Sequence, residues 1–231
     1  IMLSSSIKKY IDYFGVKCGD KISLFTNNDS AYETAVSLSK SGTTVNSIID
    51  IREKSESIIV NQAKNLGIKI YWKHSIVNTQ GYKKINSIDI MKLSDDGTSV
   101  TGNKIKENCD CLGISGGWTP MVHLFTQSGG KLKFNEIDNI FIPDKGSPDQ
   151  ISIGSCNGDF ELDDVLKNSI KDTKKFLHIE NSNFDKIDVQ CSKEKEKKNI
   201  WLLPSDKPLS KTKPFLDYQN DSTAKDIKLA L

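Results

Sequence analysis

The sequence predicts an α/β protein with a central parallel β-sheet, and three observations support this fold class. Two short apolar segments, residues 21–25 (KISLF) and 46–51 (NSIIDI), have the length and composition of buried strands. The segment between them has the apolar spacing of a helix. An order of strand, polar loop, helix and strand is a βαβ unit, whose crossover is expected to be right-handed. Later strand-like segments predict a β-meander that covers this unit.

The first elements follow from apolar spacing, glycine stops and cap residues. Residues 4–14 have apolar side chains at helical spacing, and Gly15 ends that helix. The polar loop 26–30 consists of short side chains that hydrogen-bond readily to nearby backbone. Ser30 followed by Glu33 is a capping-box pattern, which predicts the start of the helix of the βαβ unit.

The rest of the chain predicts further strands, one long helix and a linker. A second helix is expected over residues 55–66, ending at Gly67. Another helix is expected over residues 162–179, and a charged, solvated linker over residues 193–199. A new unit is expected to begin at Trp201. The other segments expected to be strands are residues 68–72, 84–93, 109–115 and 151–158.

Composition sets limits on partners and location. The 231 residues are 27% charged with a net charge of +2, which gives no case for nucleic acid as a partner. No apolar run approaches the roughly 20 residues of a membrane span, so no membrane partner is expected. Five cysteines, an odd number at irregular spacing without an export signal, favour reduced thiols in the cytoplasm. The three histidines are scattered, and no metal site is predicted.

The ends of the sequence suggest a fragment. The first residue is Ile1 rather than Met, and the last seven residues, KDIKLAL, have the pattern of a helix cut off in mid-course. We therefore expect the chain to be part of a longer protein.

The first candidate binding site is the loop 26-TNNDSAY-32. Dinucleotide sites have a glycine-rich turn here, so that a pyrophosphate reaches backbone N–H groups at a helix N-terminus. Thr26, Asn27 and Asn28 begin this turn instead, and the aspartate after them would repel a pyrophosphate. Asp50, at the end of the next strand, is placed to accept a ribose hydroxyl, and Arg52 to meet adenine or a phosphate. The alternatives are a simple helix cap and a surface ion pair.

The second candidate is the stretch 112-LGISGGWTPMVHLF-125. Gly116 and Gly117 end an apolar run and permit positive φ and close approach of a ligand to the backbone. Trp118 is then an apolar wall, and Pro120 fixes the direction of the exit. The alternative is a tight strand-to-helix turn with a purely structural role.

The third candidate is 151-ISIGSCNG-158. Flavoproteins of the two-dinucleotide-domain class usually have an apolar strand that ends in Gly-Asp, with the carboxylate bonded to the ribityl chain. Gly154 fits that pattern, but Ser155 stands where the carboxylate is expected. No Ser/His/Asp order, carboxylate pair or CxxC motif is evident, so no catalytic residue is predicted in this chain.

The segments FTNNDSAYETAVSLSKSG, CDCLGISGGWTPMVHLFTQSGGKLKF and PFLDYQNDSTAKDIKLAL resemble the α subunit of heterotetrameric sarcosine oxidase. The strings SGGW-x-P-x-VHL and DxQND-x-TAKD are long enough to be distinctive. The resemblance implies an FAD/NAD(P)-binding two-dinucleotide-domain fold, similar to disulfide reductases, that holds NAD rather than FAD. It also implies an oxidoreductase acting on a CH–NH donor: sarcosine becomes glycine, oxygen becomes hydrogen peroxide, and tetrahydrofolate takes the one-carbon unit.

The same resemblance implies partners and a domain plan. The partners are β, γ and δ subunits, with FAD and FMN carried mainly by β, and tetrahydrofolate used in a domain outside this chain. Residues 1–105 would be an inserted NAD-binding-type domain with its leading helix. Residues 106–192 would be the C-terminal part of the first FAD/NAD-binding-like domain. Residues 193–231 would be a linker and the start of a small iron–sulfur-protein-like domain.

Two other functions stay open at this point. One is a related amine dehydrogenase or reductase subunit that uses FAD and NAD(P)H. The other is a non-catalytic scaffold subunit that has lost nucleotide binding. The identity of the N-methyl amine substrate is left open, and so is the choice between a catalytic and a structural NAD.

Overall fold

The structure is a computed structural model in which the chain forms two compact units. The first unit comprises residues 1–115 and 198–231, and the second unit comprises residues 116–197. The structure describes residues 1–179, 189, 199–200, 202–208, 211–217 and 220–231.

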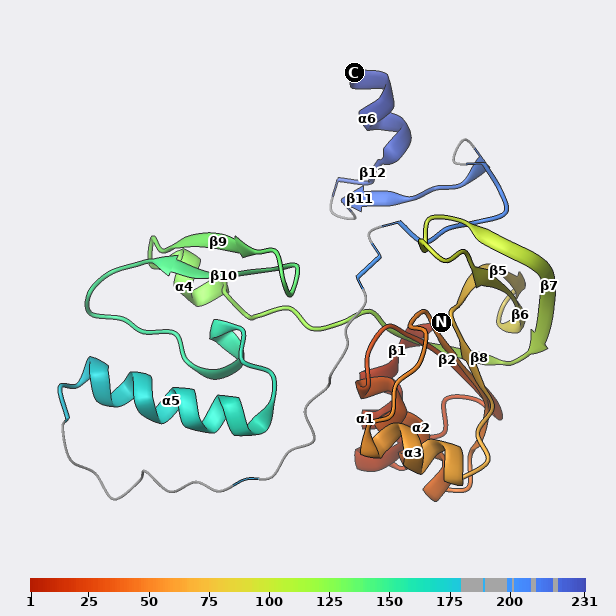
Figure 1. Ribbon diagram of the computed structural model, residues 1–231, viewed down its shortest axis with the longest axis horizontal. Helices are drawn as coiled ribbons and strands as arrows, with labels where there is room; N and C mark the ends of the chain where they lie inside the picture. Colours follow the sequence, from red (N-terminus) through yellow and green to blue (C-terminus); the bar gives the residue numbers. More distant parts are fainter. Residues whose placement is uncertain (180–188, 190–198, 201, 209–210, 218–219) are drawn as a thin grey trace. The chain divides into compact units, whose positions relative to one another are not determined.

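The first unit is built on a five-stranded sheet in the order β1-β8-β2-β3-β4, in which every pairing is parallel (Figure 1). The predicted fold class is confirmed, because β2 and β3 lie side by side in parallel, with Thr26 opposite Asp50. The strands of this sheet are β1 (Met2–Leu3), β2 (Lys21–Thr26), β3 (Thr44–Asp50), β4 (Ile70–Trp72) and β8 (Cys111–Ser115).

Each face of the sheet is covered by a different layer. Three helices, α1 (Ser4–Phe14), α2 (Ser30–Lys40) and α3 (Ile58–Asn65), pack against one face. An antiparallel meander covers the other face, as predicted. Its strands are β5 (His74–Gly81), β6 (Ile85–Leu93) and β7 (Val100–Asn108). Of the three segments expected to form it, only residues 84–93 do so, whereas residues 68–72 and 109–115 contribute parallel strands to the main sheet.

Strand alternation divides the core into two clusters. Leu24 and Ile48 point toward the helices, whereas their neighbours Phe25 and Ile49 point toward the meander. Gly113 of β8 faces the helices, where a Cβ atom would lie 2.6 Å from Leu24 Cδ2 and 2.8 Å from Ile7 Cδ1. A glycine is therefore needed here for close packing of α1 on the sheet.

Several expectations about the first unit are corrected. Strand β8, which we assigned to a domain over residues 106–192, pairs with β1 and β2 and belongs to the first sheet. It begins at Cys111, two residues later than the strand expected over residues 109–115. The meander strands β5 and β7 were not expected, because their sequences are polar and lack regular alternation.

The second unit contains a hairpin and a long helix. The helix predicted over residues 162–179 is confirmed as α5 (Leu162–Phe176). The strand predicted over residues 151–158 is wrong, because this segment ends in the short 3-10 helix η1 (Gly154–Asn157). The unit also contains α4 (His123–Gln127), β9 (Lys131–Asn135) and β10 (Ile140–Lys145).

The C-terminal residues form a small hairpin and a capped helix. Strands β11 (Phe215–Asp217) and β12 (Ser222–Thr223) pair in antiparallel fashion, and α6 (Ala224–Ala230) follows. Most of the predicted linker 193–199 and the predicted unit start at Trp201 lie outside the described residues.

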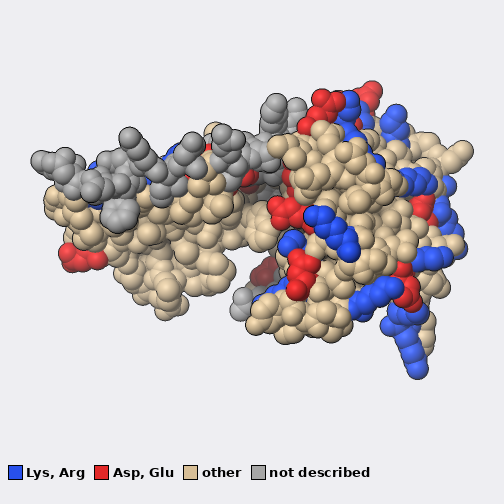
Figure 2. Space-filling view, turned by 90° about the horizontal axis from the view of Figure 1, so that it is seen from below, with Lys and Arg blue, Asp and Glu red and all other residues tan. Residues whose placement is uncertain are grey.

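The charged surface is mixed. On the face drawn in Figure 2, lysine and arginine side chains of the first unit are interspersed with aspartate and glutamate. This distribution matches the small net charge of +2 and forms no basic patch on the described part of that face. Within the part of the chain that the structure describes, no helix is both long and apolar enough to cross a membrane.

The position of Gly113 generates the first prediction. Gly113→Ala places a methyl group against two fully buried side chains, so we expect the free energy of unfolding to fall by about 1–3 kcal/mol. Gly116→Ala is the matched control, since no atom lies within 4 Å of its added Cβ. Urea denaturation of both variants measures the difference, and equal midpoints would contradict the packing argument.

Candidate functional site

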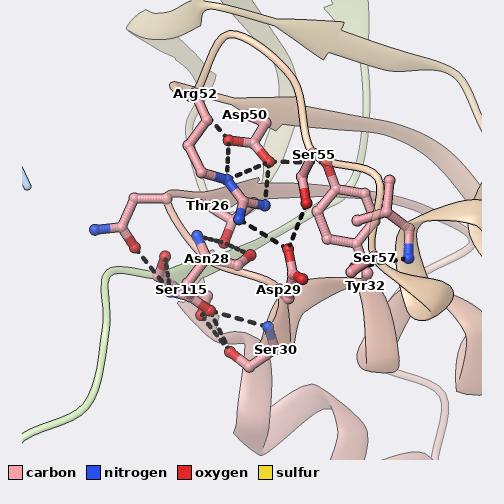
Figure 3. Close-up of polar contacts among 12 residues, drawn as sticks. Thr26, Asn28, Asp29, Ser30, Tyr32, Asp50, Arg52, Ser55, Ser57 and Ser115 are labelled. Atoms are coloured by element: carbon pink, nitrogen blue, oxygen red, sulfur yellow. Dashed lines mark hydrogen bonds and ion pairs between the residues drawn. The ribbon is translucent and has the colours of Figure 1, made fainter. Parts of the chain in front are cut away.

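Three parallel strands end at one edge of the sheet, and polar side chains stand at each end. Thr26 ends β2, Asp50 ends β3 and Ser115 ends β8, and Thr26 is in register with both of the others. Figure 3 shows these side chains together with the first turn of α2. In open α/β sheets, ligands bind in the crevice outside the carboxyl ends of the strands. This edge is therefore the candidate site of the first unit.

The loop after β2 is fastened to the neighbouring strand by its own polar groups. The Thr26 hydroxyl donates to the Asn28 carbonyl oxygen at 2.8 Å and accepts from the Asn28 backbone N–H at 3.1 Å. The Asn28 amide donates to the carbonyl of Ser115 at 3.3 Å and to Asn27 Oδ1 at 2.7 Å. The backbone N–H of Asn27 also donates to the Ser115 carbonyl, at 3.4 Å. The loop is thus closed against β8.

Asn28 caps the helix that follows. Its Oδ1 accepts from the backbone N–H of Ser30 at 3.0 Å and from the hydroxyl of Ser115 at 3.2 Å. The Ser30 hydroxyl donates to the same oxygen at 2.5 Å. Helix α2 begins at Ser30 as predicted, but the capping box expected from Ser30 and Glu33 is wrong, because Asn28 supplies the accepting oxygen. Sequence reasoning missed the bonds from Ser115.

Asp50 and Arg52 meet each other at this edge. The Asp50 carboxylate is fully buried and accepts from Arg52 Nη2 at 2.8 Å, Nε at 3.1 Å and the backbone N–H at 2.9 Å. The Tyr32 hydroxyl donates to the same carboxylate at 2.8 Å. Arg52 Nη1 lies 2.8 Å from Asp29 Oδ1, and only 2% of the arginine side chain is exposed. These four side chains, Asp29, Tyr32, Asp50 and Arg52, form a closed network, which we call the Arg52 network.

The electrostatics of the Arg52 network follow from burial and pairing. Burial alone would lower the pKa of Arg52, but hydrogen bonds and charges from Asp50 and Asp29 raise it above its ordinary value. Burial and the adjacent negative charge of Asp50 raise the pKa of Tyr32. The tyrosine is therefore a neutral hydrogen-bond donor, and the arginine is a cation between two carboxylates.

The dinucleotide contacts predicted for Asp50 and Arg52 stay a prediction; in the structure both side chains have partners within the chain. Alternation along β3 turns Asp50 toward the helix face, where Arg52 and Tyr32 bind its carboxylate oxygens. No part of the Asp50 side chain is exposed to accept a ribose hydroxyl. The sequence placed this acid and Arg52 at the strand end, but it did not indicate Tyr32. The one feature that could have indicated Tyr32 is its position on the buried side of α2.

The predicted residues of the GGW turn, residues 116–120, lie in the second unit, in irregular chain that follows β8. Gly117 has a φ of 116°, a conformation that favours glycine, whereas Gly116 lies outside the positive-φ region. Trp118 is 53% exposed and so is not a core residue, whereas Pro120 is buried. The turn therefore has the backbone freedom and the exposed ring that the ligand-facing interpretation requires.

Gly154 serves the packing of the second unit, whereas Ser155 lies at its surface. Gly154 is buried with a φ of 62°, and a Cβ atom there would lie 3.3 Å from Val165 Cγ1 of α5. A helix of the same unit therefore approaches Gly154 closely, and the ligand approach predicted there stays a prediction. Ser155 is exposed in the first turn of η1. Among the described residues, no three histidine, cysteine or acidic side chains come together as a possible metal site.

The fold of the first unit is that of an α/β protein, with a parallel sheet between a helix layer and an antiparallel meander. No protein-family model matches the chain. The chain is 27% identical over 237 residues to the sarcosine oxidase α subunit of Corynebacterium sp. strain P-1. It is 29% identical over 234 residues to that of Corynebacterium sp. strain U-96, and 24% identical over 236 residues to that of Rhizobium meliloti strain 1021.

These alignments cover 98–100% of this chain but only 22–24% of each relative, so the chain spans about a quarter of their length. The resemblance to the sarcosine oxidase α subunit is therefore confirmed along the whole chain. Among solved structures, T. acidophilum thioredoxin reductase is similar with a TM-score of 0.45 and 18% identity, covering 68% of this chain and 52% of that one. The flavoprotein disulfide reductase RclA of Escherichia coli has a TM-score of 0.45 and 13% identity, covering 68% of this chain and 35% of that one.

The Arg52 network generates the second prediction. Arg52→Met leaves two carboxylates without their cation, and Asp50→Asn leaves the cation half paired, so we expect each to cost about 3–5 kcal/mol of unfolding free energy. The double variant should cost clearly less than the sum, because each charge is needed only to balance the other. Lys54→Met, in the exposed pair with Glu56, is the control and should cost less than about 1 kcal/mol. Urea denaturation measures all four variants, and additive losses in the double variant would contradict the assignment.

Proposed function

We propose that this chain is part of the α subunit of a heterotetrameric sarcosine oxidase. The observation that carries the proposal is similarity to three such subunits over 98–100% of the chain. The complex would be a cytoplasmic oxidoreductase that acts on the CH–NH group of its donor. Sarcosine, oxygen and tetrahydrofolate would be converted to glycine, hydrogen peroxide and 5,10-methylenetetrahydrofolate.

The cofactor that we assign to the α subunit is NAD. Ser155 supports NAD over FAD, because a serine cannot act as the carboxylate partner of a ribityl chain. FAD and FMN would be carried mainly by the β subunit, and tetrahydrofolate would act in a domain outside this chain. NAD, when bound, supplies a nicotinamide ring that can accept a hydride.

The residues of this chain that we place beside the dinucleotide are those of the GGW turn. The positive φ of Gly117 and the open space around Gly116 leave one side of the backbone free of side chains. The exposed Trp118 ring offers an apolar face to a planar ring and excludes water from it. Pro120, which is buried, fixes the chain direction after the turn.

Partner subunits are supported by the apolar surface of the second unit. Met121 is 67% exposed, Leu124 86%, Ile137 88% and Phe141 55%. Where such side chains adjoin one another, they form the kind of apolar patch that a partner covers. We assign β, γ and δ subunits as those partners.

The function is tested on the full-length α subunit produced together with its β, γ and δ partners. The proposal expects a stable complex that consumes oxygen and releases hydrogen peroxide when sarcosine is added. Oxidation of the amine without oxygen consumption would instead favour a dehydrogenase. A complex that is active without any nucleotide on the α subunit would favour a scaffold role.

The third prediction concerns the cofactor of the isolated subunit. We expect the full-length α subunit, produced alone, to retain NAD and no flavin, because Ser155 replaces the usual carboxylate. Denaturation, followed by chromatography and absorbance spectra of the supernatant, identifies the released cofactor. Stoichiometric release of FAD from this subunit would overturn the assignment.

The fourth prediction separates a binding role of the GGW turn from a structural role. Gly117→Val and Trp118→Ala should each lower the NAD content of the assembled complex at least several-fold, with little effect of Trp118→Ala on stability, since this residue is half exposed. Gly129→Val is the matched control, because Gly129 also has a positive φ (86°) and open space around it. It should show a similar strain of about 1–3 kcal/mol but unchanged NAD content. Normal NAD content in both turn variants would contradict the binding role.

A further inference from the structure

We infer that the strand-edge crevice of the first unit is closed by the chain's own side chains and binds no dinucleotide. Arg52 takes the acid that a dinucleotide ribose would need, and Asn28 takes the start of the helix that a pyrophosphate would need. Any dinucleotide of the subunit is then held outside residues 26–52. This inference is independent of the proposed substrate and cofactor, since it rests on contacts inside the first unit.

The first step is the state of the acid. A ribose hydroxyl needs a carboxylate oxygen that is accessible and has a vacant acceptor position. Both oxygens of Asp50 accept from Arg52 at 2.8–3.2 Å, and Tyr32 adds a further bond at 2.8 Å. The Asp50 side chain has no exposed surface. A ribose would have to displace a buried guanidinium from its ion pair, which leaves an uncompensated charge.

The second step is the state of the helix start. Pyrophosphate binding at such a site uses the first N–H groups of the helix and a glycine turn that lets phosphate come close. Here Asn28 Oδ1 already accepts from the Ser30 N–H, and the side chain of Asn28 is held by Ser115. Residues 26–30 contain no glycine, so side chains occupy the space beside the backbone.

The third step is charge. The Arg52 network has one cation and two carboxylates, from Asp29 and Asp50, which gives a formal charge of −1. Asp29 stands immediately before the helix, where a phosphate would otherwise approach. A pyrophosphate therefore meets net repulsion at the position where sites of this kind provide attraction.

The Arg52 network fills the strand edge with side chains of the chain itself, in the place where other proteins of this architecture hold a ligand. Arg52 joins the end of β3 to the loop before α2, and Tyr32 stacks on Trp72 of β4 at 6.2 Å between ring centroids. The crevice edge is thus packed from β2 to β4 by the chain itself. We therefore assign the first unit a structural role rather than a binding role.

Hydrogen–deuterium exchange on the full-length α subunit tests the inference directly. The nucleotide-free subunit is compared before and after saturation with NAD, and the same is done with NADP. We expect unchanged exchange in residues 26–32 and 50–52. Protection confined to residues 116–120 supports both this inference and the proposed cofactor, whereas no protection anywhere supports the inference and contradicts the cofactor alone. Protection in residues 26–32 or 50–52 overturns the inference.

A pair of variants gives an independent measurement of NAD affinity. Asp50→Asn should leave the NAD dissociation constant of the full-length subunit unchanged within about threefold, and so should the control Asp89→Asn, a buried acid of the meander. Loss of a hydrogen bond between a ribose and a charged acceptor would instead weaken binding by roughly tenfold or more. Such a loss in Asp50→Asn alone overturns the inference. Should Asp50→Asn fail to fold, the hydrogen–deuterium exchange comparison on the unmodified subunit decides the inference by itself.

Discussion

The architecture of the first unit depends on one constraint, which is that a buried charge must be paired where it stands. Asp50 is the last residue of β3 and follows two fully buried isoleucines, Ile48 and Ile49, and alternation turns it into the helix layer. A carboxylate in that position is tolerated only with a cation and further donors around it. Arg52 is two residues away and folds back to supply the cation, while Tyr32 of α2 supplies a donor. The position of α2 is thereby linked to the end of β3.

A second constraint works with the first, because α1 must lie very close to the sheet. The absence of a side chain at Gly113 admits Ile7 of α1 and Leu24 of β2 to the same space. The sheet is then covered on both faces, by helices on one and by the meander on the other. This double coverage explains why the central strands are almost continuously buried, as is usual for parallel sheets. A unit packed in this way has little room for loops that move to admit a ligand.

The sequence predicted those parts of the fold whose signals are local. The buried strands around Leu24 and Ile48 and the helix after Ser30 follow from apolar spacing over a few residues. The polar strands β5 and β7 were missed because their place in the meander is set by pairing with β6, a contact between distant residues. The site shows the same division. Asp50 was located from the strand end, but its partner Tyr32 lies 18 residues earlier and was not indicated.

The closed crevice of the first unit and the open GGW turn of the second unit differ in what a ligand would have to displace. A fold defines where a ligand can bind, but the residues at that place decide whether it does. In the first unit, polar side chains at the strand ends satisfy one another, so a ligand there would have to break these bonds before it could form its own. In the second unit, Gly117 has a positive φ and the Trp118 ring is half exposed, so a ligand there would not have to break a buried ion pair. This difference in the free energy needed to admit a ligand underlies the two roles that we propose. The first unit is an internal support, and the second unit provides the surface that receives cofactor and partner.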